Sequence, residues 1–382
     1  MVNRRSFLLG SSALALAPLL TACGANGEKL QIRALNQSIP PQLLREFEPG
    51  AAIRPAATLK DLLELLQRWQ REPEPISGRW DWVPFVNRGT PALADLVTLG
   101  DSWLAIAIRA NLIQPLELTT LPHWPQLPRR WQDLGRRDRQ GFPTTDPQAP
   151  LWGAPYRWGT TMIVYREDVF QSLGWRPQDW ADLWRPELRD RLSMVDQPRE
   201  IIGLTLKKLG ESYNSWDLAA IANLETELAA LAPQVRYYSN HQYLHPLAIK
   251  ETWAAVGWST DILPALQNYP QFRAVVPPSG TALWADLWVA PQGRQLDRRA
   301  QDWIDFCWQG RSAQNISLFT QGAAPTMLNL PRDQWLPDLQ TNAAQFPPTE
   351  ILNRSEFLKP LPQAAQLQYD TLWRKLRSPQ PL

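Results

Sequence analysis

The 382-residue chain is long enough for two compact domains of about 100–200 residues each. Hydrophobic residues make up 44% of the chain and charged residues 20%, which excludes wholesale disorder. The 39 Lys and Arg residues nearly balance the 37 Asp and Glu residues, and a net charge of +2 does not indicate nucleic acid as a partner. Two cysteines exclude a disulfide scaffold and a multi-cysteine metal site, while 20 tryptophans make indole the commonest aromatic group.

The N-terminus has the parts of a bacterial export signal. Arg4 and Arg5 precede an apolar run from Phe7 to Leu20, and small residues follow it. This run of about 14 residues is shorter than the roughly 20 that span a bilayer. We therefore expect a signal peptide at residues 1–23 and no permanent membrane helix.

Two short motifs within this signal predict the export route and the final location. Leu20-Thr21-Ala22-Cys23 resembles the lipobox of bacterial lipoproteins, in which the cysteine becomes lipidated. Asn3–Leu8 resembles a twin-arginine signal, with the general export route as the alternative. Because several acyl chains on one cysteine anchor a protein stably, we predict a periplasmic or extracytoplasmic protein tethered to a membrane through Cys23.

The rest of the chain alternates predicted strands and helices. Short runs rich in Val, Ile and aromatic residues predict strands at 29–35, 95–99, 161–165, 192–195, 254–258, 272–276 and 287–290. Apolar residues at helical spacing predict helices at 42–47, 59–69, 102–110, 201–209, 217–231 and 298–308. This order predicts α/β layers with largely parallel sheets, and the proline-rich stretch 143–155 is predicted to be a loop between the two domains.

Catalytic and metal-binding motifs are absent from the sequence. It contains no GxGxxG, GxxxxGK[ST] or GxSxG pattern. His241 and His245 lie four residues apart, but Pro246 argues against a helix that would bring them together. The lone thiol outside the signal, Cys307, lies in an apolar helical pattern that predicts a buried structural cysteine. We therefore predict neither an enzyme nor a resident metal or cofactor.

Several motifs in collinear order resemble one family of proteins. The most specific stretch is Trp180–Glu187 (WADLWRPE), followed by Leu192–Glu200 (LSMVDQPRE). Pro155-Tyr156-x-Trp158-Gly159, Gly257-Trp258 and Trp284-Ala285-Asp286 match in the same order. From about residue 29 to residue 329 the chain is similar to the spermidine/putrescine-binding proteins of bacterial ABC importers.

This resemblance implies an α/β fold of the two-lobed (type II) periplasmic-binding-protein kind, with a ligand cleft between the lobes. The first lobe would comprise residues 28–158 and 286–338, and the second lobe residues 159–285 and 339–382. The implied function is that of an extracytoplasmic solute-binding lipoprotein, which takes up putrescine or spermidine and delivers it to an ABC permease and its ATPase.

The same resemblance assigns roles to particular side chains. Glu200 would hold one amino group of the polyamine and Asp286 the other, while Trp258 and Trp284 would sandwich the methylene chain. These roles are chemically suitable, because a desolvated ammonium group needs a carboxylate, and aromatic faces attract cations by about 0.5–2 kcal/mol per contact.

The strand pattern around Asp286 leaves two interpretations of this residue. Strand alternation would place Trp284, Asp286 and Trp288 on one side of the chain. A carboxylate between two indoles suits an ammonium group, and this is the interpretation that we favour. An ion pair with an arginine near the lobe hinge is the alternative.

The sequence also departs from the family pattern. Positions at which the family carries acidic, aromatic or serine residues hold Gln197, Leu35, Ser38, Gly100, Ser102 and an alanine near Gly322. Asp196 lies beside Gln197 and Trp103 beside Ser102, so both are further candidate ligand residues. The ligand could be shorter than a polyamine or carry one cation only. Another organic amine, an amino-acid-like cation or a metal ion is an alternative solute, and a structural, non-transport lipoprotein is an alternative function.

Overall fold

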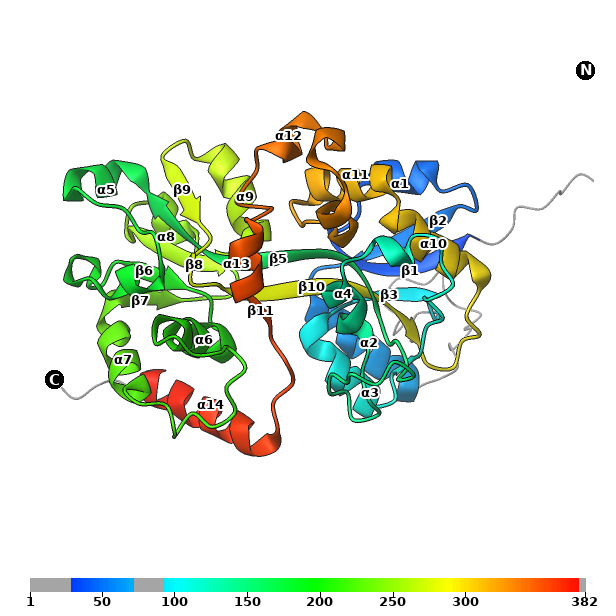
Figure 1. The fold of residues 1–382 in the computed structure, drawn as a ribbon, viewed down its shortest axis with the longest axis horizontal. Helices are drawn as coiled ribbons and strands as arrows, with labels where there is room; N and C mark the ends of the chain where they lie inside the picture. Colours follow the sequence, from blue (N-terminus) through cyan, green and yellow to red (C-terminus); the bar gives the residue numbers. More distant parts are fainter. Residues whose placement is uncertain (1–28, 72–91, 378–382) are drawn as a thin grey trace, which may run out of the picture.

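The computed structural model describes residues 29–71 and 92–377. The predicted signal peptide and its Cys23 lie outside these residues. Two lobes are joined by long strands at the centre of the molecule (Figure 1). Each lobe has its own hydrophobic core, one built from residues between Leu30 and Trp158 and between Leu283 and Phe357, the other mainly from Met162 to Ala282. The exact lobe boundaries stay a prediction.

The first lobe contains a sheet whose first strands are parallel. Its strands are β1 (Leu30–Leu35), β2 (Ala51–Ala56) and β3 (Leu96–Gly100), with β1 between the other two. Its helices are α1 (Pro41–Glu46), α2 (Leu59–Arg71), α3 (Leu104–Arg109), α4 (Arg129–Gln132), α10 (Arg298–Trp308), α11 (Gly310–Thr320) and α12 (Pro337–Gln340). A capping box starts α2, because Thr58 Oγ1 accepts from the Asp61 amide while the Asp61 carboxylate accepts from the Thr58 amide.

The second lobe has the same layered construction. Its strands are β6 (Leu192–Met194), β7 (Val235–Tyr238), β8 (Ala254–Trp258) and β9 (Phe272–Val275), and β6 is parallel to both β7 and β8. Its helices are α5 (Glu167–Leu173), α6 (Pro198–Lys208), α7 (Leu224–Leu231), α8 (His245–Ala248), α9 (Ser259–Asn268) and α14 (Gln363–Arg377). A small apolar cluster, including Tyr369, joins α6, α7 and α14.

Two antiparallel strands connect the lobes. β5 (Ala154–Arg166) pairs with β10 (Ala282–Pro291) over its first half and with β8 and β9 over its second half. The short strands β4 (Ile113–Gln114) and β11 (Glu356–Phe357) pair with β10, and α13 (Thr349–Arg354) lies beside the crossing (Figure 1). The prediction that the loop 143–155 crosses between the lobes is therefore wrong, since a strand makes this crossing.

The sequence located most elements and misplaced several ends. The predicted bounds of β8 and α10 agree with the structure, but β5 and β10 begin earlier than predicted, and β2 was not predicted. The helix predicted at 217–231 begins only at Leu224, because Asn223 has a left-handed backbone with φ of 64°. The sheet is mixed rather than largely parallel, since β10 runs antiparallel to both β3 and β5.

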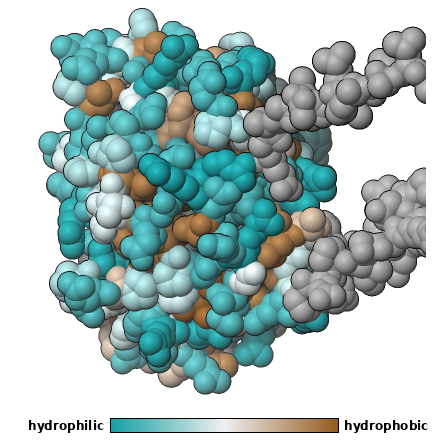
Figure 2. Space-filling view, turned by 90° about the vertical axis from the view of Figure 1, so that its right-hand side faces the viewer, coloured by the Kyte–Doolittle hydropathy of each residue, from teal (hydrophilic) through white to brown (hydrophobic). Residues whose placement is uncertain are grey.

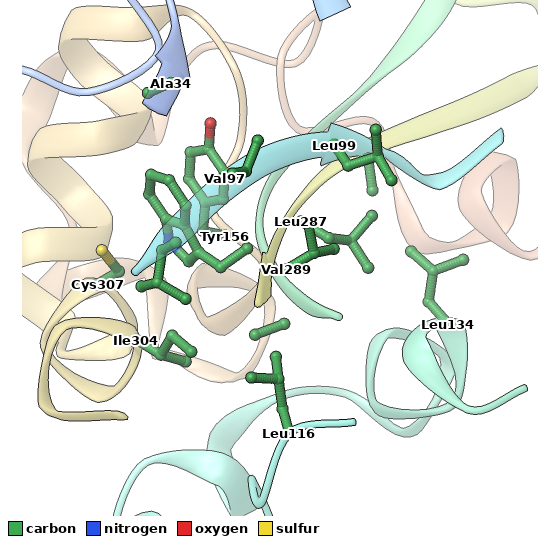
Figure 3. Close-up of a cluster of buried hydrophobic side chains, with 14 of the residues drawn as sticks. Ala34, Val97, Leu99, Leu116, Leu134, Tyr156, Leu287, Val289, Ile304 and Cys307 are labelled. Carbon is green, nitrogen blue, oxygen red and sulfur yellow. The ribbon is translucent and has the colours of Figure 1, made fainter. Parts of the chain in front are cut away.

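Tryptophans and other apolar side chains fill the first core. Figure 3 shows Tyr156 beside Val97 of β3, with Ile304 and Cys307 on α10 nearby. The Tyr156 ring stacks on that of Trp288 at 4.3 Å between centroids. Cys307 is fully buried, as predicted, and burial raises the pKa of its thiol.

The surface differs from this interior. The face of the first lobe in Figure 2 is mostly hydrophilic, with hydrophobic residues scattered over it. No helix within residues 29–71 and 92–377 is long and apolar enough to cross a membrane.

Candidate ligand-binding site

A buried carboxylate lies where β5 enters the second lobe. Glu200, in the first turn of α6, is only 6% exposed. Thr161 Oγ1 donates to Glu200 Oε2 at 2.9 Å, and Trp258 Nε1 donates to Oε1 at 3.3 Å. Burial raises the pKa of Glu200, and these two hydrogen bonds oppose the rise. Among the described residues no cationic group forms an ion pair with Glu200.

The backbone and a tyrosine position Trp258 beside this carboxylate. Trp258 is directly opposite Thr161 in the β5–β8 ladder. The Trp258 amide donates to the hydroxyl of Tyr243 at 3.1 Å, and that hydroxyl donates to Asp261 at 2.8 Å. A Cβ at Gly257 would lie 2.0 Å from the Tyr243 ring, so glycine is required there. The position of the indole thus depends on contacts on both sides of β8.

The second predicted indole lies two residues back along β5. Trp284 of β10 is directly opposite Gly159 and is partly exposed. A Cβ at Gly159 would lie 2.3 Å from the Trp284 ring and 2.3 Å from Ser259 Oγ. The ring therefore occupies the space above Gly159. Since Gly159 and Thr161 share a face of β5, Trp284 and Trp258 both adjoin that face.

Arg157 continues the same face of β5. Its Nε donates to Asp286 Oδ2 at 2.6 Å, and both residues are buried, at 5% and 2% exposed. The guanidinium carbon lies 5.8 Å from the centroid of the Trp284 ring. Burial alone would lower the pKa of Arg157, but the charge of Asp286 and the Tyr156 hydroxyl raise it, so the guanidinium stays charged.

This pairing bears on the two interpretations of Asp286, and a ligand role for Asp286 stays a prediction. The sequence favoured an unpaired carboxylate, whereas the structure has the alternative, an ion pair with an arginine at the lobe junction. The two flanking indoles also differ. Trp284 lies next to Arg157, but Trp288 is fully buried in the first core, stacked on Tyr156.

Comparison with known proteins places this arrangement in a family. Residues 92–353 match the family described as bacterial extracellular solute-binding proteins. The chain belongs to this family.

Individual relatives agree with the resemblance predicted from the sequence. A putrescine/cadaverine-binding protein of Pseudomonas aeruginosa is 27% identical over 59% of this chain and 66% of its own length. A spermidine/putrescine-binding periplasmic protein of Salmonella typhimurium is 22% identical over 97% of both chains. The structure of the spermidine/putrescine ABC transporter substrate-binding protein PotD from Streptococcus pneumoniae has a TM-score of 0.76, covering 92% of this chain and 98% of PotD at 19% identity. The predicted two-lobed fold of periplasmic binding proteins is thereby confirmed.

Two of the predicted ligand residues of this solute-binding protein lie apart from Glu200. Asp196 is partly exposed, and its carboxylate lies 3.7 Å from the guanidinium of Arg377 in α14. Trp103 lies in the turn after β3 and packs against the first core. A ligand role for either residue stays a prediction.

Sequence reasoning missed two buried charged residues near β10. Arg157 occupies the position written x in the Pro155-Tyr156-x-Trp158-Gly159 motif. Side chains alternate along a strand, so Arg157 lies on the same face of β5 as Gly159 and Thr161. Asp101 is buried, and its Oδ1 accepts from the Ala285 amide at 3.1 Å. Burial raises the pKa of Asp101 to about 7, against the opposing effects of that hydrogen bond and of Arg137.

A groove elsewhere on the second lobe contains none of these residues. It has a volume of about 870 Å³ and lies beside α5, where its lining includes Tyr165, Trp175 and Arg185. Arg185 covers the Trp175 ring at 4.1 Å. The carboxylates that line this groove are not buried, whereas Glu200 is.

Proposed function

We propose that this chain is the receptor of an ABC importer and binds an organic amine between its lobes. The observation that carries the proposal is the buried Glu200 carboxylate, which has hydrogen-bond donors but no ion-pair partner among the described residues. A buried charge of this kind is costly unless a cation compensates it. An ammonium group between Trp258 and Trp284 would supply that charge and contact two aromatic faces.

The relatives favour the same class of solute. The names of the Pseudomonas aeruginosa and Salmonella typhimurium proteins specify putrescine, cadaverine and spermidine. Delivery to a membrane permease and its ATPase follows from a receptor role. Lipidation of Cys23 would keep the receptor near that permease, and the lipobox of the sequence supports this part of the proposal.

Calorimetry and thermal melting with a panel of amines test the proposal. We expect at least one amine to bind and, at 100 times its Kd, to stabilise the protein by about 2.7 kcal/mol. Glu200→Gln should weaken this binding by about 2–5 kcal/mol, because it removes the charge that the ammonium contacts. The control is Glu211→Gln, which changes an exposed carboxylate in the loop after the C-terminal end of α6. A protein to which no amine binds, or a Glu200→Gln variant with wild-type affinity, would contradict the proposal.

A further inference from the structure

The end of the site nearest the first lobe already contains a cation of the protein's own. The Arg157 side chain passes over Gly322, where a Cβ would lie 3.1 Å from Arg157 Cδ. It then reaches Trp284 and Asp286, with the guanidinium 5.8 Å from the indole centroid and 2.6 Å from the carboxylate. A buried guanidinium therefore lies at the position where the second ammonium of a diamine would meet Asp286.

The other carboxylates near this face of β5, those of Asp101 and Asp261, do not provide a second ammonium site equivalent to Glu200. Asp101 accepts a hydrogen bond from the Ala285 amide, and the positive charge of the buried Arg137 lowers its pKa. Asp261, in the first turn of α9, is an exposed residue whose carboxylate accepts a hydrogen bond from the Tyr243 hydroxyl, and the positive charge of Arg157 also acts on it. Glu200 is thus the buried carboxylate of this face that has only neutral hydrogen-bond donors and no ion-pair partner in the described part of the chain, although the charge of Arg199 acts on it.

We propose, on the basis of the proposed function, that the ligand is a monocation. Its single ammonium group would bind Glu200, and its far end would be uncharged and meet the neutral Arg157–Asp286 pair. A second ammonium at Asp286 would lie beside the Arg157 guanidinium that already occupies Oδ2, and the two positive charges would repel each other in a buried site. A hydroxyl group at that end meets no such repulsion and can exchange hydrogen bonds with the intact pair.

The first test compares ligands on the wild-type protein by calorimetry. Amino alcohols and diamines of equal chain length, from three to six carbons, form matched pairs such as 4-aminobutan-1-ol and putrescine. We expect the tightest amino alcohol to bind about tenfold or more tightly than the tightest diamine. Equal or tighter binding of the diamines would overturn the inference. Tighter binding of the matched amino acid, such as 4-aminobutanoate, would also overturn it, because Arg157 would then be an anion site.

The second test removes the internal cation. Arg157→Met keeps the aliphatic stem and frees Asp286, so the preference should reverse in favour of the diamine. The double variant Arg157→Met with Asp286→Asn is the control, since it removes both charges and should keep the wild-type preference. A folded Arg157→Met protein that still prefers the amino alcohol, or a double variant that prefers the diamine, would overturn the inference. If Arg157→Met does not fold, the comparison on wild type decides alone.

These outcomes separate the two proposals. If no amine of either series binds wild type, the proposed function fails. If diamines bind wild type most tightly and Glu200→Gln abolishes that binding, the proposed function stands and the monocation inference fails.

Discussion

The role of Asp286 depends on a residue 129 positions away in the sequence. From the sequence alone, Asp286 is a carboxylate in an apolar strand, and its partner could be a ligand or one of many arginines. The β5–β10 register provides an arginine partner, because it places Asp286 directly opposite Arg157. Pairing across antiparallel strands depends on register, and no local pattern specified that register here.

Asp286→Asn tests how much the Arg157–Asp286 ion pair contributes to the stability of the fold. The amide would leave the Arg157 guanidinium buried without a charged partner, so we expect the free energy of unfolding to fall by about 3–5 kcal/mol. Urea denaturation measures this loss. Adding Arg157→Met to the variant should recover most of the stability, since no charge is then stranded. An Asp286→Asn protein that unfolds like wild type but has lost amine binding would restore Asp286 as a ligand residue.

The sequence analysis identified other residues of the candidate site. The resemblance named Glu200 and Trp258, and the structure joins them by a hydrogen bond. Thr161 and Tyr243, which hold the two in place, could not be named, because their contacts depend on the packing of β8 against its neighbours. Motifs therefore identified the charged and aromatic members, and the supporting contacts required coordinates.

At the scale of elements, β5 is the part that the sequence described least well. Pro155 and Gly159 interrupt the strand pattern, so only 161–165 was predicted, whereas the strand begins at Ala154. The structure explains why a proline and a glycine occupy these two positions. Pro155 lies at a register shift opposite Leu287, and Gly159 leaves room for Trp284. Pro155 and Gly159 thus mark a bulge and a close contact with Trp284 rather than a loop.

Gly159→Ala tests that reading of β5. A methyl group there would lie within 2.3 Å of the Trp284 ring and Ser259, so the indole must move. We expect a loss of about 1–3 kcal/mol in stability and weaker amine binding, measured by urea denaturation and calorimetry. Gly310→Ala is the control, because its Cβ would find no atom closer than 4.0 Å. Wild-type stability and affinity in the Gly159→Ala protein would mean that Trp284 does not depend on Gly159.

At the scale of the whole molecule, the two lobes and their connection by strands agree with the fold that the resemblance implied. The resemblance assigned residues 339–382 to the second lobe but did not specify which elements they form. After α12 the chain runs through α13 and β11 at the junction and ends as α14 on the second lobe (Figure 1). Tyr369 of α14 is fully buried, and its hydroxyl donates to the Tyr213 carbonyl. The C-terminal helix is thus an integral part of that lobe.

The proposed membrane anchor is Cys23, which lies outside the described residues. Cys23→Ser should release the protein into the soluble fraction after a salt wash without changing amine affinity, because the acyl chains would have no attachment point. Cell fractionation followed by immunoblotting measures this. Cys307→Ala provides the matched cysteine control and should stay with the membranes, since Cys307 is fully buried. Cys23→Ser protein that remains in the membrane pellet would disprove the anchor.

The connection through β10 also affects how the protein is made. In the first lobe, β3 pairs with β1 on one side and with β10 on the other, but β10 comes some 180 residues later in the chain. During translation the edge of β3 therefore stays open until residues 282–291 have left the ribosome. The second lobe's core between Met162 and Ala282 is by then almost complete. Until then the edges of both β3 and β5 that pair with β10 are open, and unpaired strand edges of this kind favour aggregation of a nascent chain.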